Sequence, residues 1–135
     1  METMKRAVCA LIYRDATKSQ LLGISRRNKP EDMNLPGGKV DPGETSEDAL
    51  RREVKEEVDL DVLSAALVFQ RPCYGEDNYE ASCYEVTYRG VPKAVEQGFV
   101  IRWISWGELL DPKNSFASYN QQLHDHLRAS GLIPK

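Results

Sequence analysis

The stretch that decides the fold is residues 34–60, NLPGGKVDPGETSEDALRREVKEEVDL. Its second half predicts a helix over residues 46–58, because apolar residues recur there at helical spacing. Thr45 or Ser46 is the expected N-cap, and Asp48 is placed to close a capping box with Thr45. A Pro- and Gly-rich segment comes directly before this helix, so the stretch combines a loop with a helix.

One face of the predicted helix gathers three carboxylates. At 100° per residue, Glu53, Glu56 and Glu57 lie within about 100° of each other, next to an apolar stripe with Leu50 and Val54 that we expect to face the core. Glu53 and Glu57 are like charges at i,i+4, which is mildly destabilising. A hard divalent cation would remove this cost, because Mg²⁺ prefers carboxylate oxygens and often completes its shell with substrate phosphate.

The preceding segment, residues 28–43, is expected to be a functional loop. Gly37 and Gly38 allow the backbone to approach a ligand, and Asp41-Pro42-Gly43 predicts a tight turn. A loop folded onto a carboxylate-bearing helix would bring phosphate, metal and water together, as metal-assisted attack on a diphosphate requires. We therefore take Gly37, Gly38 and Lys39 as candidate substrate contacts.

This pattern resembles the Nudix box, which residues 38–60 match at eight of its nine specified positions: Gly38, Glu44, Arg52, Glu53, Val54, Glu56, Glu57 and Leu60. The resemblance implies an α/β fold, the Nudix-type α/β/α sandwich with a mixed sheet between helices, and one domain over residues 1–135. It also implies hydrolysis of a nucleoside diphosphate linked to another group, with Mg²⁺ or Mn²⁺ as the cofactor.

The resemblance also implies roles for residues of the box. Glu53, Glu56 and Glu57 correspond to metal ligands, with the Gly38 carbonyl as a further one. Glu57 corresponds either to a ligand or to the catalytic base, and the sequence does not separate these roles.

Two other box positions have structural consequences. Arg52 corresponds to the partner of Glu44, in a pair that braces the loop on the helix. The glycine that usually follows the helix is Asp59 here. Because Asp is among the better substitutes in the left-handed conformation, we expect activity to be retained.

Outside the box, the resemblance points to further contacts. Glu96 lies seven residues before Trp103, where many family members carry an additional metal-binding or basic Glu; the alternative is a plain loop residue. Arg26 and Asn34 occupy positions similar to nucleotide contacts in the MutT-like branch, which removes oxidised nucleotides. The alternative for Arg26 is a solvated strand end shared with Arg27.

The segment before the last predicted helix also resembles that branch, because Phe116 is followed by three other residues and then by Asn120. There the Asn amide reads a base edge, because one amide can both donate and accept. The alternative is a helix N-cap. Tyr74 and Tyr79 are candidates for stacking on a base.

The rest of the chain predicts strands that alternate with short helices. Residues 6–13 and 20–26 are expected to form a hairpin, because a short polar turn joins two apolar runs. Further strands are expected over 62–71, 82–88 and 99–104, with a helical turn at 106–110 and a final helix over 118–129.

Composition restricts the function. The chain has 135 residues and a net charge of −3, and residues 41–61 hold nine acidic against three basic residues. The acidic balance argues against a stable nucleic-acid partner. Three cysteines without a close-spaced pair argue against a disulfide framework. With no long apolar run, we expect a cytoplasmic protein without membrane association; the oligomeric state is left open.

The leading hypothesis is a pyrophosphohydrolase that converts a (d)NTP, with oxidised nucleotides as candidate substrates, into a nucleoside monophosphate and pyrophosphate. ADP-ribose and dinucleoside polyphosphates are alternative substrates. A different class is a Nudix-fold sensor that binds nucleotide without cleaving it, although such modules usually lose a box carboxylate.

Overall fold

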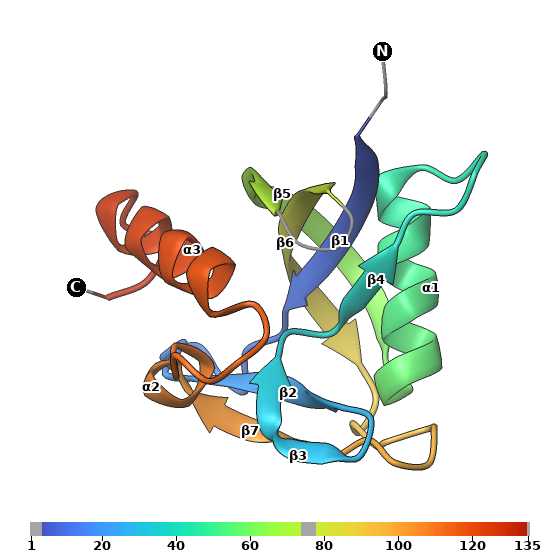
Figure 1. Cartoon of the computed structure of the whole chain (residues 1–135), viewed down its shortest axis with the longest axis horizontal. Coiled ribbons are helices and arrows are strands. Elements are labelled where there is room, and N and C mark those ends of the chain that lie inside the picture. Colours follow the sequence, from blue (N-terminus) through green and yellow to red (C-terminus); the bar gives the residue numbers. More distant parts are fainter. Residues whose placement is uncertain (1–3, 74–77, 135) are drawn as a thin grey trace.

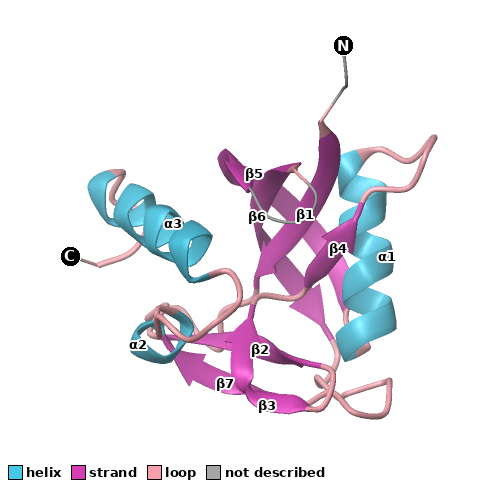
Figure 2. Cartoon of the chain, in the orientation of Figure 1, coloured by secondary structure: helices cyan, strands magenta, loops and turns pink. Residues whose placement is uncertain are grey.

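The structure is a computed structural model that describes residues 4–73 and 78–134, in which seven strands form two sheets and three helices pack around them (Figure 1, Figure 2). In chain order the elements are β1 (Lys5–Leu11), β2 (Gln20–Arg26), β3 (Lys29–Asn34), β4 (Gly37–Lys39), α1 (Ser46–Val58), β5 (Asp61–Cys73), β6 (Tyr79–Arg89), β7 (Ile101–Ser105), α2 (Trp106–Leu109) and α3 (Ala117–Ala129).

The first sheet is mixed and has the strand order β4-β1-β6-β5. Its central pair, β1 and β6, is parallel, whereas the β1–β4 and β5–β6 pairs are antiparallel. The second sheet, β3-β2-β7, is antiparallel throughout. The sequence predicted one mixed sheet, and the structure has this sheet together with a second, smaller one.

Helices α1 and α3 cover opposite faces of the mixed sheet (Figure 2). Successive residues of a strand point to opposite faces. Val8 of β1 packs with Leu50 and Val54 of α1, whereas Leu11 packs with Leu123 of α3 in a separate core cluster. All five side chains are buried. The predicted α/β/α arrangement is therefore confirmed, and the apolar stripe of the box helix faces the core as expected.

The predicted hairpin between residues 6–13 and 20–26 is wrong. β4 and β6 occupy the two edges of β1, so β2 joins the other sheet. A single bridge between Tyr13 and Leu21 connects the two segments where β1 has already ended.

The prediction that residues 28–43 form only a loop is also wrong, because they contain β3 and β4. Both are edge strands, where Pro30 and the neighbouring Pro36 are tolerated because one side of the strand needs no ladder hydrogen bond. Gly37 is required for the pairing itself: a Cβ at this position would lie 2.0 Å from the carbonyl oxygen of Val8 on β1.

The other predicted elements are found with small shifts at their ends: three strands (β5, β6 and β7), the short helix α2 and the final helix α3. None of the helices in the described part of the chain is long and apolar enough to cross a membrane.

Candidate active site

Helix α1 is fixed at both ends and along its buried face. Thr45 is the N-cap, and its hydroxyl accepts a hydrogen bond from the Asp48 N–H at 3.1 Å. At the other end Asp59 adopts the left-handed conformation with φ 59°, as expected for the residue that replaces the usual glycine. This anchoring gives the carboxylates of α1 a defined position above β4.

Glu57 is the most enclosed of these carboxylates. Its Oε1 accepts a hydrogen bond from the N–H of Gly37 on β4 at 2.8 Å. Burial raises the pKa of Glu57 to about 8; the Gly37 N–H opposes this, and Glu53, Glu96 and Glu56 raise it further. A carboxyl group that is buried away from water and close to other acids favours its neutral form.

Arg52 neutralises most of the remaining acids. Its guanidinium binds Glu44 through two bonds of 2.8 Å, the bidentate geometry that favours arginine. It also contacts Glu53 at 2.8 Å and Glu56 at 3.3 Å. Hydrogen bonds from Arg52 and from the Asp41 N–H hold the pKa of Glu44 at about 2. The expected Arg52–Glu44 pair is therefore present, but the same guanidinium also binds two of the box carboxylates.

Four acids line one cavity of about 90 Å³: Glu53, Glu56, Glu57 and Glu96. Ile24 and Phe99 complete its lining. Glu96 reaches this cavity from the loop before β7, where the N–H of Val95 donates to the Glu57 carbonyl at 3.4 Å. Arg27 holds Glu96 by an ion pair at 3.3 Å. We call this space the carboxylate cavity.

The carboxylate cavity has the donors that a hard divalent cation prefers, because its polar lining consists of carboxylates. Glu57 has no cationic partner among the described residues, and its pKa is raised mainly by burial and further by the neighbouring acids, whose charge a bound cation would compensate. As the side chains stand, no three Asp, Glu, His or Cys residues of the described chain are close enough together to enclose an ion. The carboxylate donors of the cavity fit a cation by their chemistry, and they would have to move closer together to enclose one.

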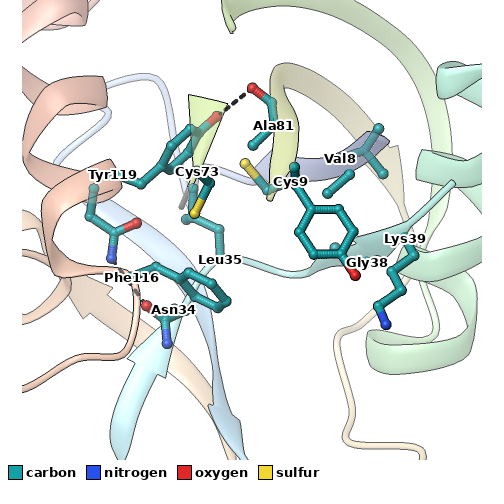
Figure 3. Close-up of a pocket in the computed structure, with 14 residues that line it drawn as sticks. Val8, Cys9, Asn34, Leu35, Gly38, Lys39, Cys73, Ala81, Phe116 and Tyr119 are labelled. Carbon is teal, nitrogen blue, oxygen red and sulfur yellow. Dashed lines mark hydrogen bonds between the residues drawn. The ribbon is translucent and has the colours of Figure 1, made fainter. Parts of the chain in front are cut away.

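A second cavity of about 280 Å³ lies on the other side of β4, and we call it the base cavity (Figure 3). Its lining is mostly apolar and includes Phe116, the N-cap of α3, and Tyr119 in the first turn of α3, with the Asn34 amide next to the Phe116 ring (Figure 3). Lys39 lies at the opposite end from Asn34 (Figure 3). Flat aromatic walls with few polar groups suit a heterocyclic ligand.

Two amides supply the polar lining near α3. Asn120 is 2% exposed, and its Nδ2 donates to Asn34 Oδ1 at 3.1 Å and to the Leu109 carbonyl at 3.2 Å. Asn120 lies in the first turn of α3, which begins at Ala117, so it is not the N-cap. The capping alternative is therefore excluded.

Strand β4 lines the base cavity and contacts two acids of the carboxylate cavity, Glu53 and Glu57. Gly37 and Gly38 line the base cavity, while the Gly37 N–H binds Glu57 in the carboxylate cavity. A Cβ on Gly38 would lie 2.5 Å from the carboxyl carbon of Glu53. The two glycines therefore allow the acids of α1 to lie directly against the strand.

The profile of the NUDIX domain matches residues 3–125. The chain belongs to the NUDIX family. A Bacillus subtilis relative named "Putative 8-oxo-dGTP diphosphatase" is 42% identical over 124 residues, covering 84% of this chain and 82% of the relative. A dihydroneopterin triphosphate diphosphatase of Escherichia coli is 39% identical over 61 residues, covering 45% of this chain and 40% of the relative.

A solved NUDIX structure shares the fold. The MutT NUDIX hydrolase from Burkholderia pseudomallei superposes with a TM-score of 0.75 at 27% identity, covering 90% of this chain and 98% of that one. NUDIX hydrolases generally use divalent metals. Together with relatives named as diphosphatases, this membership identifies the chain as a NUDIX pyrophosphohydrolase.

The structure separates the predicted site residues into two groups. Three acids of the NUDIX box, Glu53, Glu56 and Glu57, line the carboxylate cavity with Glu96, while Glu44 pairs with Arg52 outside it. The candidate substrate contacts Asn34, Gly37, Gly38, Lys39 and Asn120 line the base cavity. Arg26 is exposed and is not part of either lining. Tyr79 lines the base cavity, whereas Tyr74 lies outside the described residues.

Two residues of this NUDIX site were not predicted. Arg27 binds Glu96, and its guanidinium lies 5.0 Å from the Phe99 ring centre. Asp32 accepts a hydrogen bond from Asn34 at 3.1 Å. Recognition of β3 as a strand would have indicated Asp32, because residues i and i+2 of a strand lie on the same side.

Proposed function

We propose that the chain is a Mg²⁺-dependent nucleoside triphosphate pyrophosphohydrolase that acts on oxidised purine nucleotides such as 8-oxo-dGTP. The products would be a nucleoside monophosphate and pyrophosphate. The observation that carries this proposal is the position of β4, which has an amide-lined apolar cavity on one side and a carboxylate cavity on the other. A nucleotide needs both environments, one for its base and one for its phosphates.

In this proposal the acids of the carboxylate cavity hold the metal. Glu53, Glu56 and Glu57 are the ligands, and Glu96 and the Gly38 carbonyl complete the candidate set. A bound Mg²⁺ supplies charge neutralisation at the diphosphate and lowers the pKa of water. Mn²⁺ satisfies the same oxygen donors.

The chain's own residues position the metal site and hold protons there. Arg52 and Glu44 brace the loop on α1 through their two short hydrogen bonds. Glu57 is placed either to ligate the metal or to accept the proton of the attacking water.

In the base cavity, the amides of Asn34 and Asn120 are proposed to contact the base edge. Gly37, Gly38 and Lys39 lie between the two cavities, where the sugar and phosphates would cross from one to the other. The position of Arg26 does not support a contact with the base. The proposal takes residues 1–135 as one domain in the cytoplasm, with a small nucleotide as its partner.

The substrate is tested with a panel of nucleotides. Purified protein with Mg²⁺ would be given 8-oxo-dGTP, dGTP, dihydroneopterin triphosphate, ADP-ribose and a dinucleoside tetraphosphate, and pyrophosphate and phosphate release would be measured. We expect the highest kcat/KM with 8-oxo-dGTP and release of pyrophosphate. A preference for dihydroneopterin triphosphate or ADP-ribose would overturn the substrate class.

Two matched variants test whether turnover depends on the carboxylate cavity. E57Q removes a group that holds metal or takes the proton, so kcat should fall by roughly 10³-fold. E47Q makes the same change at an exposed position in the first turn of α1 and should retain full activity. If E57Q keeps more than about a tenth of the wild-type kcat, the catalytic assignment is wrong. If wild type binds nucleotide and cleaves none, the protein is a sensor.

A further inference from the structure

Asp32 lies at the end of a hydrogen-bonded chain that leads into the base cavity. It stands two residues before Asn34 on β3, so both side chains lie on the same side of the strand. Its Oδ1 accepts hydrogen bonds from Asn34 Nδ2 at 3.1 Å and from the Ser115 N–H at 2.8 Å, and its Oδ2 accepts from the Ser115 hydroxyl. The carboxylate is therefore held from two chain segments.

Asp32 is the acceptor in each of these three hydrogen bonds. Partial burial works to raise its pKa, but the hydrogen bonds from Ser115 and Asn34, together with the charge of Arg26, outweigh it and hold the pKa below the usual value. An ionised carboxylate has no proton to donate. Asn34 must therefore turn its NH₂ group toward Asp32 and its carbonyl oxygen away from it.

The orientation of Asn34 in turn fixes that of Asn120. The Asn34 carbonyl oxygen accepts from Asn120 Nδ2 at 3.1 Å, and the same nitrogen donates to the Leu109 carbonyl at 3.2 Å. An amide nitrogen has two hydrogens, so both donors of Asn120 are used. Its carbonyl oxygen accepts no hydrogen bond from any residue that the structure describes.

Two polar groups of this amide pair then have no hydrogen-bond partner among the described residues. One is the second N–H of Asn34, and the other is the carbonyl oxygen of Asn120. Both residues line the cavity. The pair therefore offers one donor and one acceptor.

We propose that Asp32 is a positioning residue that fixes the polarity of the Asn34–Asn120 amide pair, so that the cavity selects a base edge with one N–H donor and one carbonyl acceptor. The inference rests on the proposed function only in that the ligand is a nucleotide whose base enters this cavity. The N7/O6 edge of 8-oxoguanine has this combination, because N7 carries a hydrogen. The same edge of guanine has two acceptors and would leave the Asn120 oxygen facing another acceptor, which is costly away from water.

The competing explanation is that Asp32 only anchors the segment before α3 through Ser115. The two roles are separable, because S115A removes the hydroxyl bond and leaves the Asp32 carboxylate and its bond to Asn34 in place. D32N keeps the size of the side chain but replaces one oxygen by an NH₂ group, so that the Asn34 amide can adopt either orientation. An anchoring role predicts similar effects from both variants, whereas the polarity role predicts an effect from D32N alone.

The experiment measures binding rather than turnover. Isothermal titration calorimetry without added metal would compare 8-oxo-dGMP with dGMP for wild type, D32N, D32S, D32E, S115A and D15N. D32S serves as a second test if D32N does not fold, because a hydroxyl both donates and accepts. D15N is the matched control. Asp15 also accepts a backbone and a side-chain hydrogen bond, both from Thr17, but it lies in an exposed turn and lines neither cavity.

We expect wild type to bind 8-oxo-dGMP about tenfold or more tightly than dGMP. D32N or D32S should reduce this ratio to about threefold or less, while D32E, S115A and D15N keep it. Equal affinity of wild type for both ligands, or an unchanged ratio in the folded D32N and D32S variants, would overturn the inference. A loss of the ratio in S115A equal to that in D32N would do the same. Absence of nucleotide hydrolysis with the expected binding ratios would overturn the proposed function and leave this inference standing.

Discussion

The buried Glu57 carboxyl makes the stability of the metal-free protein depend on pH in an unusual direction. Its pKa is about 8 in the folded chain, against 4.5 for an exposed glutamate. Between these values the folded state binds a proton that the unfolded state has lost, so the free energy of unfolding falls as the pH rises. Most carboxylates in folded proteins have the opposite effect, because their pKa values are lowered.

The expected size follows from this proton difference. Each pH unit in the window changes the free energy of unfolding by about 1.4 kcal/mol for one proton. From pH 5.5 to 7.5 the loss is therefore about 2 to 3 kcal/mol, since Glu57 shares the cavity with Glu53 and Glu96 and part of the shift belongs to them. For a domain of this size, that corresponds to a fall in Tm of roughly 10 °C.

The assay is a series of thermal melts without metal from pH 5.5 to 7.5, for wild type, E57Q and the exposed control E47Q. Wild type and E47Q should lose stability over this range, and E57Q should show a much smaller change. Addition of Mg²⁺ should raise the Tm of wild type more at pH 7.5 than at pH 5.5, because ligands must be deprotonated to bind metal. Equal pH dependence in wild type and E57Q would refute the assignment of the raised pKa to Glu57.

Three further predictions follow from single contacts. R52A should lower both Tm and activity, because it removes the two short bonds to Glu44; an unchanged Tm would show that the pair does not brace the loop. N120A should lower kcat/KM for the preferred purine nucleotide by an amount equivalent to about 1–3 kcal/mol, mostly through a higher KM and less through kcat. Equal losses of kcat/KM for purine and pyrimidine triphosphates would indicate a scaffold role. G37A should destabilise the fold by about 1–3 kcal/mol or more in denaturant melts, because its Cβ would lie 2.0 Å from a backbone oxygen of β1. G107A, whose Cβ would meet its nearest neighbour at 3.7 Å, is the matched control and should have little effect.

The box helix was predictable because its signals are local. The apolar spacing and the N-cap Thr45 gave residues 46–58, and the structure has the same bounds. β3 and β4 were missed because Pro30, Pro36 and the paired glycines are typical of loops, and their strands exist only through pairing with distant segments. Long-range pairing overrides local preference, which also explains the wrong hairpin.

The carboxylates of the site were predictable for the same reason, because helical spacing alone places Glu53, Glu56 and Glu57 on one face. The contacts of the Arg52 side chain were only partly predictable. Its pairing with Glu44 was expected, but its contacts with Glu53 and Glu56 depend on how the loop folds back onto α1. Asp32 could not be found from composition or motif, because its importance comes from one hydrogen bond to an amide within a strand that the sequence did not reveal.

The position of β4 between the base cavity and the acids of α1 limits how substitutions can change the substrate preference of the enzyme. The peptide at Gly37 touches the base cavity on one side and the carboxylate of Glu57 on the other. A substitution here that reshaped the base cavity would also displace the acids, so selectivity and chemistry cannot be altered independently along this strand. New base preferences would have to come from the opposite wall, formed by the end of β3 and the start of α3, where side chains contact the base cavity without contacting the acids.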